Sequence, residues 1–162
     1  MEGIEFERAM FSQQHANWPD LRDPTGKPGF VARWCNGAAG IGLARSGCRK
    51  IIDIEGLGGE IEIALHATLQ HYFEDGDDLC CGTFGRAEML LVGSEFSDTR
   101  DWRLLAQQGI ADAIASACIR GEYRLFTAPG LYNPAFFKGM SGIGYQILRF
   151  ASEGVPSVLL LE

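Results

Sequence analysis

The sequence predicts an all-α fold built from repeated two-helix units, and the first observation behind this prediction is a recurring glycine pattern. Three stretches share the pattern: residues 34–45 (WCNGAAGIGLAR), 79–90 (LCCGTFGRAEML) and 137–150 (FKGMSGIGYQILRF). Aligning them places Gly37 with Gly82 and Gly139, so that a Gly-x-x-Gly motif recurs at intervals of 45 and 57 residues. Repeats of this length are typical of arrays of supersecondary units.

The second observation is the pattern that follows each glycine motif. Small residues give way to apolar residues at helical spacing, as at Ile41 and Ala44 in the first copy and from Met89 to Val92 in the second. Such spacing indicates a helix that begins directly after the glycines. We therefore expect each motif to lie at the entrance of a short inner helix.

Longer amphipathic stretches between the motifs supply the third observation. Residues 59–73 and 98–119 carry apolar side chains on one face and predict outer helices, the second of them capped by Asp98 and Thr99. Each unit is then a short inner helix followed by a longer outer one.

Glycine and proline mark the connections between these helices. They predict loops in three places: residues 23–29, 73–78 and 127–134. Residues 122–126 alternate weakly and predict a short extended segment, and residues 155–162 predict a buried closing segment.

The composition predicts one domain and excludes several classes of protein. The chain has 162 residues, of which 46% are hydrophobic and 22% charged, as in ordinary globular domains. Its 14 Lys and Arg against 21 Asp and Glu argue against a nucleic-acid partner. The acidic start does not resemble a signal peptide, and no run reaches the roughly 18 apolar residues of a membrane span. We therefore expect a cytoplasmic protein.

The five cysteines are the strongest candidates for chemistry. An odd number of cysteines without an export signal disfavours a disulfide framework and favours metal binding or catalysis. In the repeat alignment Cys80 falls on the position of Cys35, and Cys81 falls opposite Asn36. If the inner helices start at one end of the array, these three sulfurs converge at helix N-termini, which favour thiolates.

Three converging thiolates predict a zinc site. Three protein ligands with an open fourth position are the pattern of catalytic zinc, and the net charge of −1 suits activation of a bound thiol better than of water. The alternative is that the cysteines are simply buried, because cysteine is often buried and short CxxC pairs are absent. Cys48 and Cys118 match nothing in the repeat and are expected to be plain thiols.

Other candidate sites are weaker. The glycine run at residues 37–42 follows no apolar strand and lacks the GxGxxG spacing of a dinucleotide loop, so no cofactor-binding residue is predicted. His66 and His71 are five residues apart and diverge on a helix, while His15 stands alone in a polar stretch. No catalytic residue follows from these patterns.

Five motifs together resemble a known family: residues 17–22 (NWPDLR), 34–45, 79–86 (LCCGTFGR), 139–149 (GMSGIGYQILR) and 156–162 (PSVLLLE). In this order they resemble the lanthionine synthetase C-like cyclases, most closely the C-terminal part of the cyclase domain of class II lanthipeptide synthetases. The resemblance covers nearly the whole chain. It implies an α/α toroid of helical hairpins, of which residues 1–162 form a partial ring of about three, with the dehydratase domain absent.

The resemblance also implies a cofactor, a substrate and a reaction. Zn²⁺ is held by Cys35, Cys80 and Cys81, and it activates a cysteine thiol of a precursor peptide. The thiol adds to dehydroalanine or dehydrobutyrine and closes a lanthionine thioether ring. Two alternatives stay open: a non-catalytic remnant that binds zinc or peptide, and an enzyme that adds a small thiol such as glutathione.

The chain departs from the family in two ways. No segment matches the motifs that supply the family's acid/base Asp and His, and Asn36 stands where relatives often carry His or Tyr. A partial ring also predicts exposed apolar helix faces, and with them self-association or a missing N-terminal partner segment.

Overall fold

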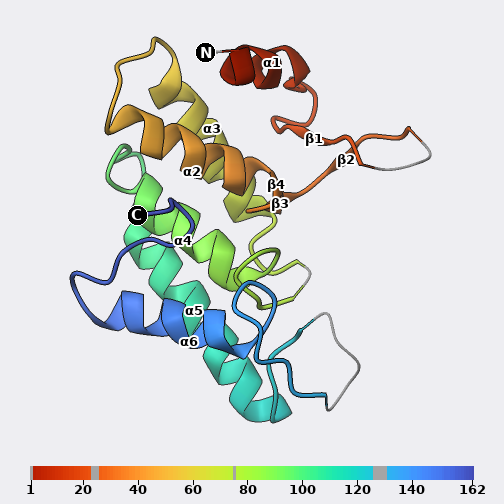
Figure 1. Ribbon diagram of the computed structural model, residues 1–162, viewed down its shortest axis with the longest axis vertical. Helices are drawn as coiled ribbons and strands as arrows, with labels where there is room; N and C mark the ends of the chain where they lie inside the picture. The colour runs from red at the N-terminus through yellow and green to blue at the C-terminus, as the bar shows by residue number, and fades with distance from the viewer. Residues whose placement is uncertain (1, 23–25, 75, 126–130) are drawn as a thin grey trace.

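The computed structural model describes residues 2–22, 26–74, 76–125 and 131–162. Within these residues it contains six helices and four strands of two residues each (Figure 1). In chain order the elements are α1 (Glu2–Met10), β1 (Pro19–Asp20), β2 (Gly29–Phe30), β3 (Ala32–Arg33), β4 (Asn36–Gly37), α2 (Ala38–Arg49), α3 (Leu57–Gln70), α4 (Thr83–Gly93), α5 (Trp102–Arg120) and α6 (Met140–Ala151). The predicted all-α class is confirmed.

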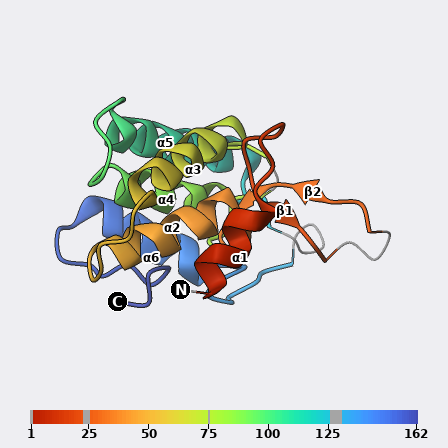
Figure 2. The ribbon, with the colours of Figure 1, turned by 90° about the horizontal axis from the view of Figure 1, so that it is seen from above.

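The helices form the predicted inner and outer layers. In Figure 2, α3 and α5 lie on one side of the layer that α2, α4 and α6 form. Helix α2 packs against α3, and α4 packs against α5, which gives two hairpins followed by the inner helix α6. Helix α4 lies at the centre, where it also contacts α2, α3 and α6, and every one of its residues is buried. This arrangement is the one expected of part of an α/α toroid.

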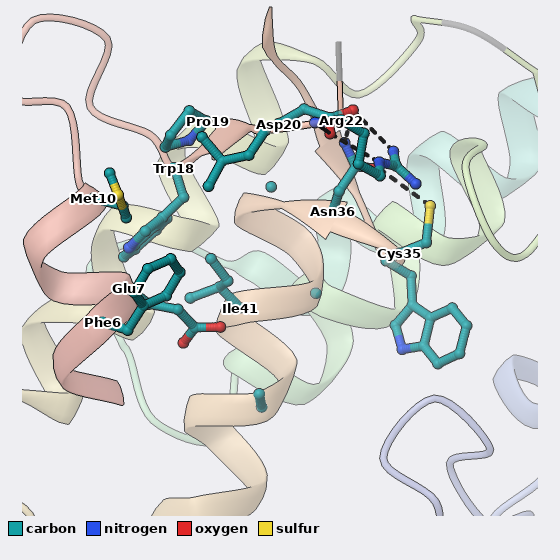
Figure 3. Close-up of a pocket in the computed structure, with 15 residues that line it drawn as sticks. Phe6, Glu7, Met10, Trp18, Pro19, Asp20, Arg22, Cys35, Asn36 and Ile41 are labelled. Atoms are coloured by element: carbon teal, nitrogen blue, oxygen red, sulfur yellow. Dashed lines mark hydrogen bonds and ion pairs between the residues drawn. The ribbon is translucent and has the colours of Figure 1, made fainter. Parts of the chain in front are cut away.

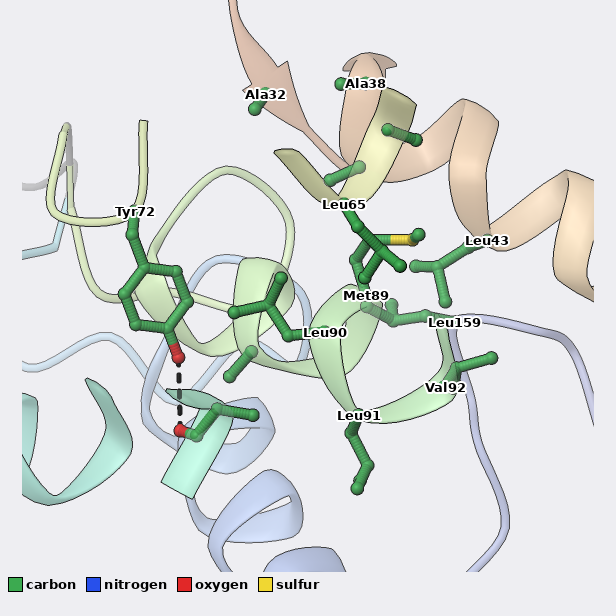
Figure 4. Close-up of a cluster of buried hydrophobic side chains, with 14 of the residues drawn as sticks. Ala32, Ala38, Leu43, Leu65, Tyr72, Met89, Leu90, Leu91, Val92 and Leu159 are labelled. Carbon is green, nitrogen blue, oxygen red and sulfur yellow. Dashed lines mark hydrogen bonds between the residues drawn. The ribbon is translucent and has the colours of Figure 1, made fainter. Parts of the chain in front are cut away.

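The core lies between the two hairpins and is built around α4 (Figure 4). Leu43 of α2, Leu65 of α3 and Met89 of α4 are all fully buried there. Gly42 lets α2 approach closely, because a Cβ at this position would lie 2.5 Å from the Met89 Cε atom. Burying each of these large side chains contributes roughly 1.5–3 kcal/mol to folding.

The Gly-x-x-Gly motif occupies the same place in all three copies, at the start of an inner helix. Its first glycine precedes the first residue of each inner helix: Gly37, Gly82 and Gly139. Its second glycine lies under the carbonyl oxygen of the residue six positions earlier. A Cβ there would be about a bond length too close to that oxygen: 2.0 Å at Gly40, 2.2 Å at Gly85 and 1.9 Å at Gly142. The chain therefore folds back over the start of its own helix, and only glycine leaves room.

Two details differ from the sequence-based expectations. Helix α5 is capped by Asp101, whose carboxylate accepts a 2.9 Å hydrogen bond from the Leu104 amide, so the prediction of Asp98 and Thr99 as caps was wrong. Residues 122–125 form no strand, because their backbone bonds instead to one buried residue: the Arg124 amide donates to the Asp77 carboxylate, and the Asp77 amide donates to the Arg124 carbonyl. Residue 126 lies outside the described residues.

The loops predicted from glycine and proline fall partly outside the described residues, at positions 23–25, 75 and 127–130. Residues 131–134 are irregular as expected, whereas the end of the second loop is not a surface segment, since Asp77 and Asp78 are fully buried. The closing segment is buried at Ser157 and Leu159 but exposed at Leu161. No helix among the described residues is both long enough and apolar enough to cross a membrane.

Candidate metal centre

The three segments that lead into the inner helices lie next to one another, and we call them the first, second and third joints (residues 34–37, 79–82 and 136–139). Backbone hydrogen bonds connect each joint to the next. The Trp34 amide donates to the Cys80 carbonyl at 3.0 Å, and the Cys80 amide donates to the Phe137 carbonyl at 2.8 Å. The rings of Trp34 and Phe137 also stack, with centroids 5.1 Å apart. The three joints therefore meet at one end of the helical array.

The first joint is a tight β-hairpin that presents Cys35 at the surface. Strands β3 and β4 pair, with Arg33 opposite Asn36, so that Trp34 and Cys35 form the two-residue turn between them. Gly37 closes this hairpin at φ 87°, and a Cβ there would lie 1.8 Å from the Val31 oxygen. Cys35 is exposed as a result.

The second joint holds its two cysteines inside the protein. Cys80 and Cys81 are 6% and 4% exposed. Asp78 fixes the turn, since its carboxylate accepts a 2.8 Å hydrogen bond from the Cys81 amide and its carbonyl accepts one from the Gly82 amide. Burial raises the pKa of the Asp78 carboxyl group.

The three sulfur atoms come together as predicted. Cys81 Sγ lies 3.6 Å from Cys35 Sγ and 3.5 Å from Cys80 Sγ, and all three sulfurs lie within 4.8 Å of one another. Tetrahedral zinc with Zn–S bonds of about 2.3 Å requires sulfurs about 3.8 Å apart. In the part of the chain that the structure describes, this is the one group of three or more side chains placed to hold a metal ion. The donor set and its spacing therefore fit zinc.

The electrostatics of the cluster also favour a cation. Hydrogen bonding with the thiols of Cys80 and Cys81, together with nearby Arg22, lowers the pKa of Cys35. The same hydrogen bonding to Cys35 raises the pKa of Cys80 and of Cys81, and burial adds to this effect. The expected lowering of thiol pKa is thus found at Cys35 alone. A second and third thiolate need a positive charge between the sulfurs, which a divalent cation supplies.

A polar network extends from Cys35 toward β1 (Figure 3). The Asn36 carboxamide accepts from Cys35 Sγ at 3.2 Å and donates to Asp20 at 2.8 Å. Asp20 forms an ion pair with Arg22 at 2.8 Å, and the hydrogen bond from Arg22 lowers the pKa of Asp20 to about 2. The guanidinium of Arg22 in turn lies beside Cys35.

The third joint contributes a cation instead of a thiol. Lys138 Nζ lies 3.6 Å from Cys81 Sγ, and the negative charge at Cys81 raises the pKa of this lysine. Sequence reasoning missed both Lys138 and Arg22. The repeat alignment could have found the first, because Lys138 occupies the position of Asn36 and Cys81. Arg22 lies in the NWPDLR motif, in which nothing points to a particular contact.

The remaining candidates lie outside the cluster, as expected. His66 pairs with Glu62 at 3.0 Å, His71 pairs with Glu74 at 2.6 Å, and His15 stacks on Phe30. Cys48 and Cys118 are free thiols that do not belong to the group of three.

The family model described as lanthionine synthetase C-like protein matches residues 2–160. No curated protein and no solved structure matches the chain significantly.

Proposed function

The chain belongs to the lanthionine synthetase C-like family, and on that premise we propose that it is a zinc-dependent cyclase acting on peptides. In the proposed reaction a peptide cysteine adds to dehydroalanine or dehydrobutyrine and forms a lanthionine thioether ring. The observation that carries the proposal is the convergence of three cysteine sulfurs within 4.8 Å at the end of the inner helices.

Cys35, Cys80 and Cys81 are the residues that would hold the ion. Bound there, zinc would lower the pKa of an incoming cysteine thiol and keep the sulfur nucleophilic at neutral pH. The chain itself supplies the geometry: the second joint fixes two sulfurs inside the protein, and the surface turn of the first joint adds the third from the solvent side.

Two cations of the chain stand beside the sulfurs and favour the proposed chemistry. Thioether formation joins sulfur to the β-carbon of the dehydro residue, moves the double-bond electron pair toward the neighbouring carbonyl as an enolate, and returns the thiol proton to the α-carbon. Negative charge therefore develops next to the site during the reaction. Arg22 beside Cys35 and Lys138 beside Cys81 place positive charge where it offsets that negative charge.

We also propose that residues 1–162 correspond to the C-terminal portion of a cyclase domain of the class II type, since all five motifs of that resemblance occur in order. All five cysteines are free thiols. Free thiols are typical of reducing compartments, which supports a cytoplasmic location.

The proposed reaction can be tested with a peptide that carries one cysteine and one dehydroalanine. Cyclisation does not change the mass of the peptide. It does consume the thiol, so the cyclic product no longer reacts with N-ethylmaleimide. We expect the zinc-loaded protein to give this product, Cys81→Ala to give none, and Cys118→Ala to behave like the unmodified chain, because Cys118 is an exposed thiol outside the cluster. Zinc uptake without cyclisation would instead favour a non-catalytic remnant. If the protein added glutathione to the dehydroalanine but formed no ring, a small-thiol enzyme would be favoured.

A further inference from the structure

A cavity of about 390 Å³ lies beside the first joint, with Cys35 in its wall (Figure 3). We propose that this cavity receives the apolar side chains that flank the reacting cysteine of the peptide, a proposal that rests on the proposed function. The lining is mostly apolar and comes from α1, the segment around β1 and the start of α2: Phe6, Met10, Trp18, Pro19, Leu21 and Ile41. Because Cys35 belongs to the same wall, a peptide whose thiol reaches the cluster brings its neighbouring side chains to the cavity.

The apolar rim of the cavity is unusually exposed. Phe6 is 59%, Leu21 58% and Met10 37% exposed. Helix α1 has no buried residue, and ion pairs attach it to the rest of the chain: Arg8 with Glu60, and Glu7 with Arg45. The apolar side chains of α1 therefore remain available to a partner, and covering them would be favourable.

The charges in the cavity wall point to a neutral occupant. Glu7 pairs with Arg45 at 2.7 Å, and Asp20 pairs with Arg22 at 2.8 Å, so each carboxylate already has its cation. A charged ligand such as glutathione would gain no uncompensated partner in this wall. A segment with apolar side chains fits it better.

Trp18 adds an independent indication of a peptide. Its side chain lines the cavity and is 3% exposed, and its indole Nε1 has no hydrogen-bond partner among the described residues. A buried donor without an acceptor is unfavourable, and most such groups in proteins find one. A backbone carbonyl of the peptide can accept this hydrogen bond once the exposed side chains of α1 shift to admit it.

A second cavity lies next to the first. Its volume is about 440 Å³, and it shares part of the same wall and extends it toward Phe30; the shared residues are Met10, Pro19, Asp20 and Leu21. The two cavities together suit an extended stretch of peptide more than a single small thiol.

The test measures binding of two labelled pentapeptides to the zinc-loaded protein by fluorescence anisotropy. One has the sequence Ser-Phe-Cys-Phe-Ser and the other Ser-Ser-Cys-Ser-Ser. We expect the phenylalanine peptide to bind about 10-fold more tightly, from the apolar surface that it buries.

A matched pair of variants tests whether the preference for the phenylalanine peptide arises in the cavity. Ala44 lines the cavity and is exposed, so Ala44→Trp fills the space without disturbing the core. Ala115 is an exposed residue of α5 that does not line the cavity, and Ala115→Trp is the control. We expect Ala44→Trp to retain its zinc and lose the preference for phenylalanine, and Ala115→Trp to keep both.

Equal affinity of the unmodified protein for the two peptides would overturn the proposal, as would a preference that survives in Ala44→Trp. These outcomes are separate from failure of the proposed function. If rings form equally well whatever residues flank the cysteine, the cavity proposal fails and the cyclase activity stands. If the phenylalanine peptide binds preferentially and no ring forms from its dehydrated form, the cavity proposal stands and the activity fails.

Discussion

The first and second joints share one close backbone contact and have opposite surroundings. In each, a helix glycine lies under the carbonyl oxygen of the residue six positions earlier, at Gly40 and at Gly85. The first joint is nevertheless a surface turn with an exposed cysteine, whereas the second is buried beside α4 with both of its cysteines covered. One repeat thus provides a fixed pair of sulfurs and an accessible third.

The third joint shows that the repeat specifies geometry and not chemistry. Phe137 and Lys138 stand at the positions that Cys80 and Cys81 occupy in the second joint. The backbone connection is retained, because Phe137 accepts from the Cys80 amide, while the side chains supply an aromatic stack and a cation. The second and third joints therefore differ in the side chains that equivalent backbone positions carry.

The largest expected effect is the loss of zinc affinity when a cysteine of the cluster is replaced, and it should be separable from any loss of folding stability. Cys35→Ser and Cys81→Ser should each weaken zinc binding by about 100-fold, since each removes one of three ligands. Without metal, however, Cys35→Ser should unfold at nearly the same urea concentration as the unmodified chain because Cys35 is exposed, while Cys81→Ser should be less stable because Cys81 is buried. Chelator competition and urea titration of the metal-free proteins check both parts, with Cys118→Ser as the control. Equal loss of stability in the two variants would contradict the contrast between the joints.

The next effect concerns the glycines under the joints. A Cβ at Gly85 would lie 2.2 Å from the Leu79 oxygen in a fully buried helix, so Gly85→Ala should lower the free energy of unfolding by about 3 kcal/mol or more. Gly40→Ala creates a similar clash, at 2.0 Å from the Trp34 oxygen, but at a position that is only partly buried, and should cost about half as much.

Gly144 provides the control for these glycine substitutions. It lies inside α6 with no atom within 4 Å of an added Cβ, so Gly144→Ala should stabilise the protein by about 0.5–1 kcal/mol. Urea unfolding of the three variants measures all these differences. A tolerated Gly85→Ala would show that the close approach in the second joint is not required.

A further comparison concerns the ion pairs beside the two joints, where one effect is large and the other is small. Asp77, next to the second joint, is fully buried and paired with Arg120 and Arg124, so Asp77→Asn should cost about 3 kcal/mol. The pair of Asp20 with Arg22 beside the first joint is partly exposed, and Asp20→Asn should cost less than about 1 kcal/mol.

The Asp20 contribution should also depend on pH in a defined direction. The pKa of Asp20 falls to about 2 in the folded protein, below its value of 3.8 when unperturbed. Its stabilisation is therefore complete above about pH 4 and is lost as the pH falls from about 4 to about 2. Urea unfolding of Asp20→Asn and the unmodified protein across this range should show their difference vanish at the acidic end. A difference that grows toward low pH would contradict the assignment.

Glycine spacing made most of the fold and the sulfur site predictable. The clash at Gly40, Gly85 and Gly142 forces glycine at one place in each unit, so the repeat could be aligned without a structure, and alignment alone put Cys35 level with Cys80. Features with no such periodicity were missed. The cap at Asp101 depends on where the first turn of α5 begins, and two-residue strands are too short to alternate.

Long-range contacts between polar side chains could not be predicted from the sequence either. Asp77 pairs with Arg120, the last residue of α5, and with Arg124 in the segment after it, both far along the chain. Arg22 lies beside Cys35 because β1, which lies just before it in the chain, contacts β4 of the first joint. Neither contact leaves a local pattern of residues.

X-ray absorption at the zinc edge of the purified, zinc-loaded protein tests the central claim most directly. The claim is that Cys35, Cys80 and Cys81 bind a single ion and leave its fourth position to a water molecule that the substrate can replace. We predict one zinc per chain with three sulfur neighbours at about 2.3 Å and one lighter neighbour. A folded protein that takes up no zinc, or a zinc shell of nitrogen and oxygen without sulfur, would contradict it.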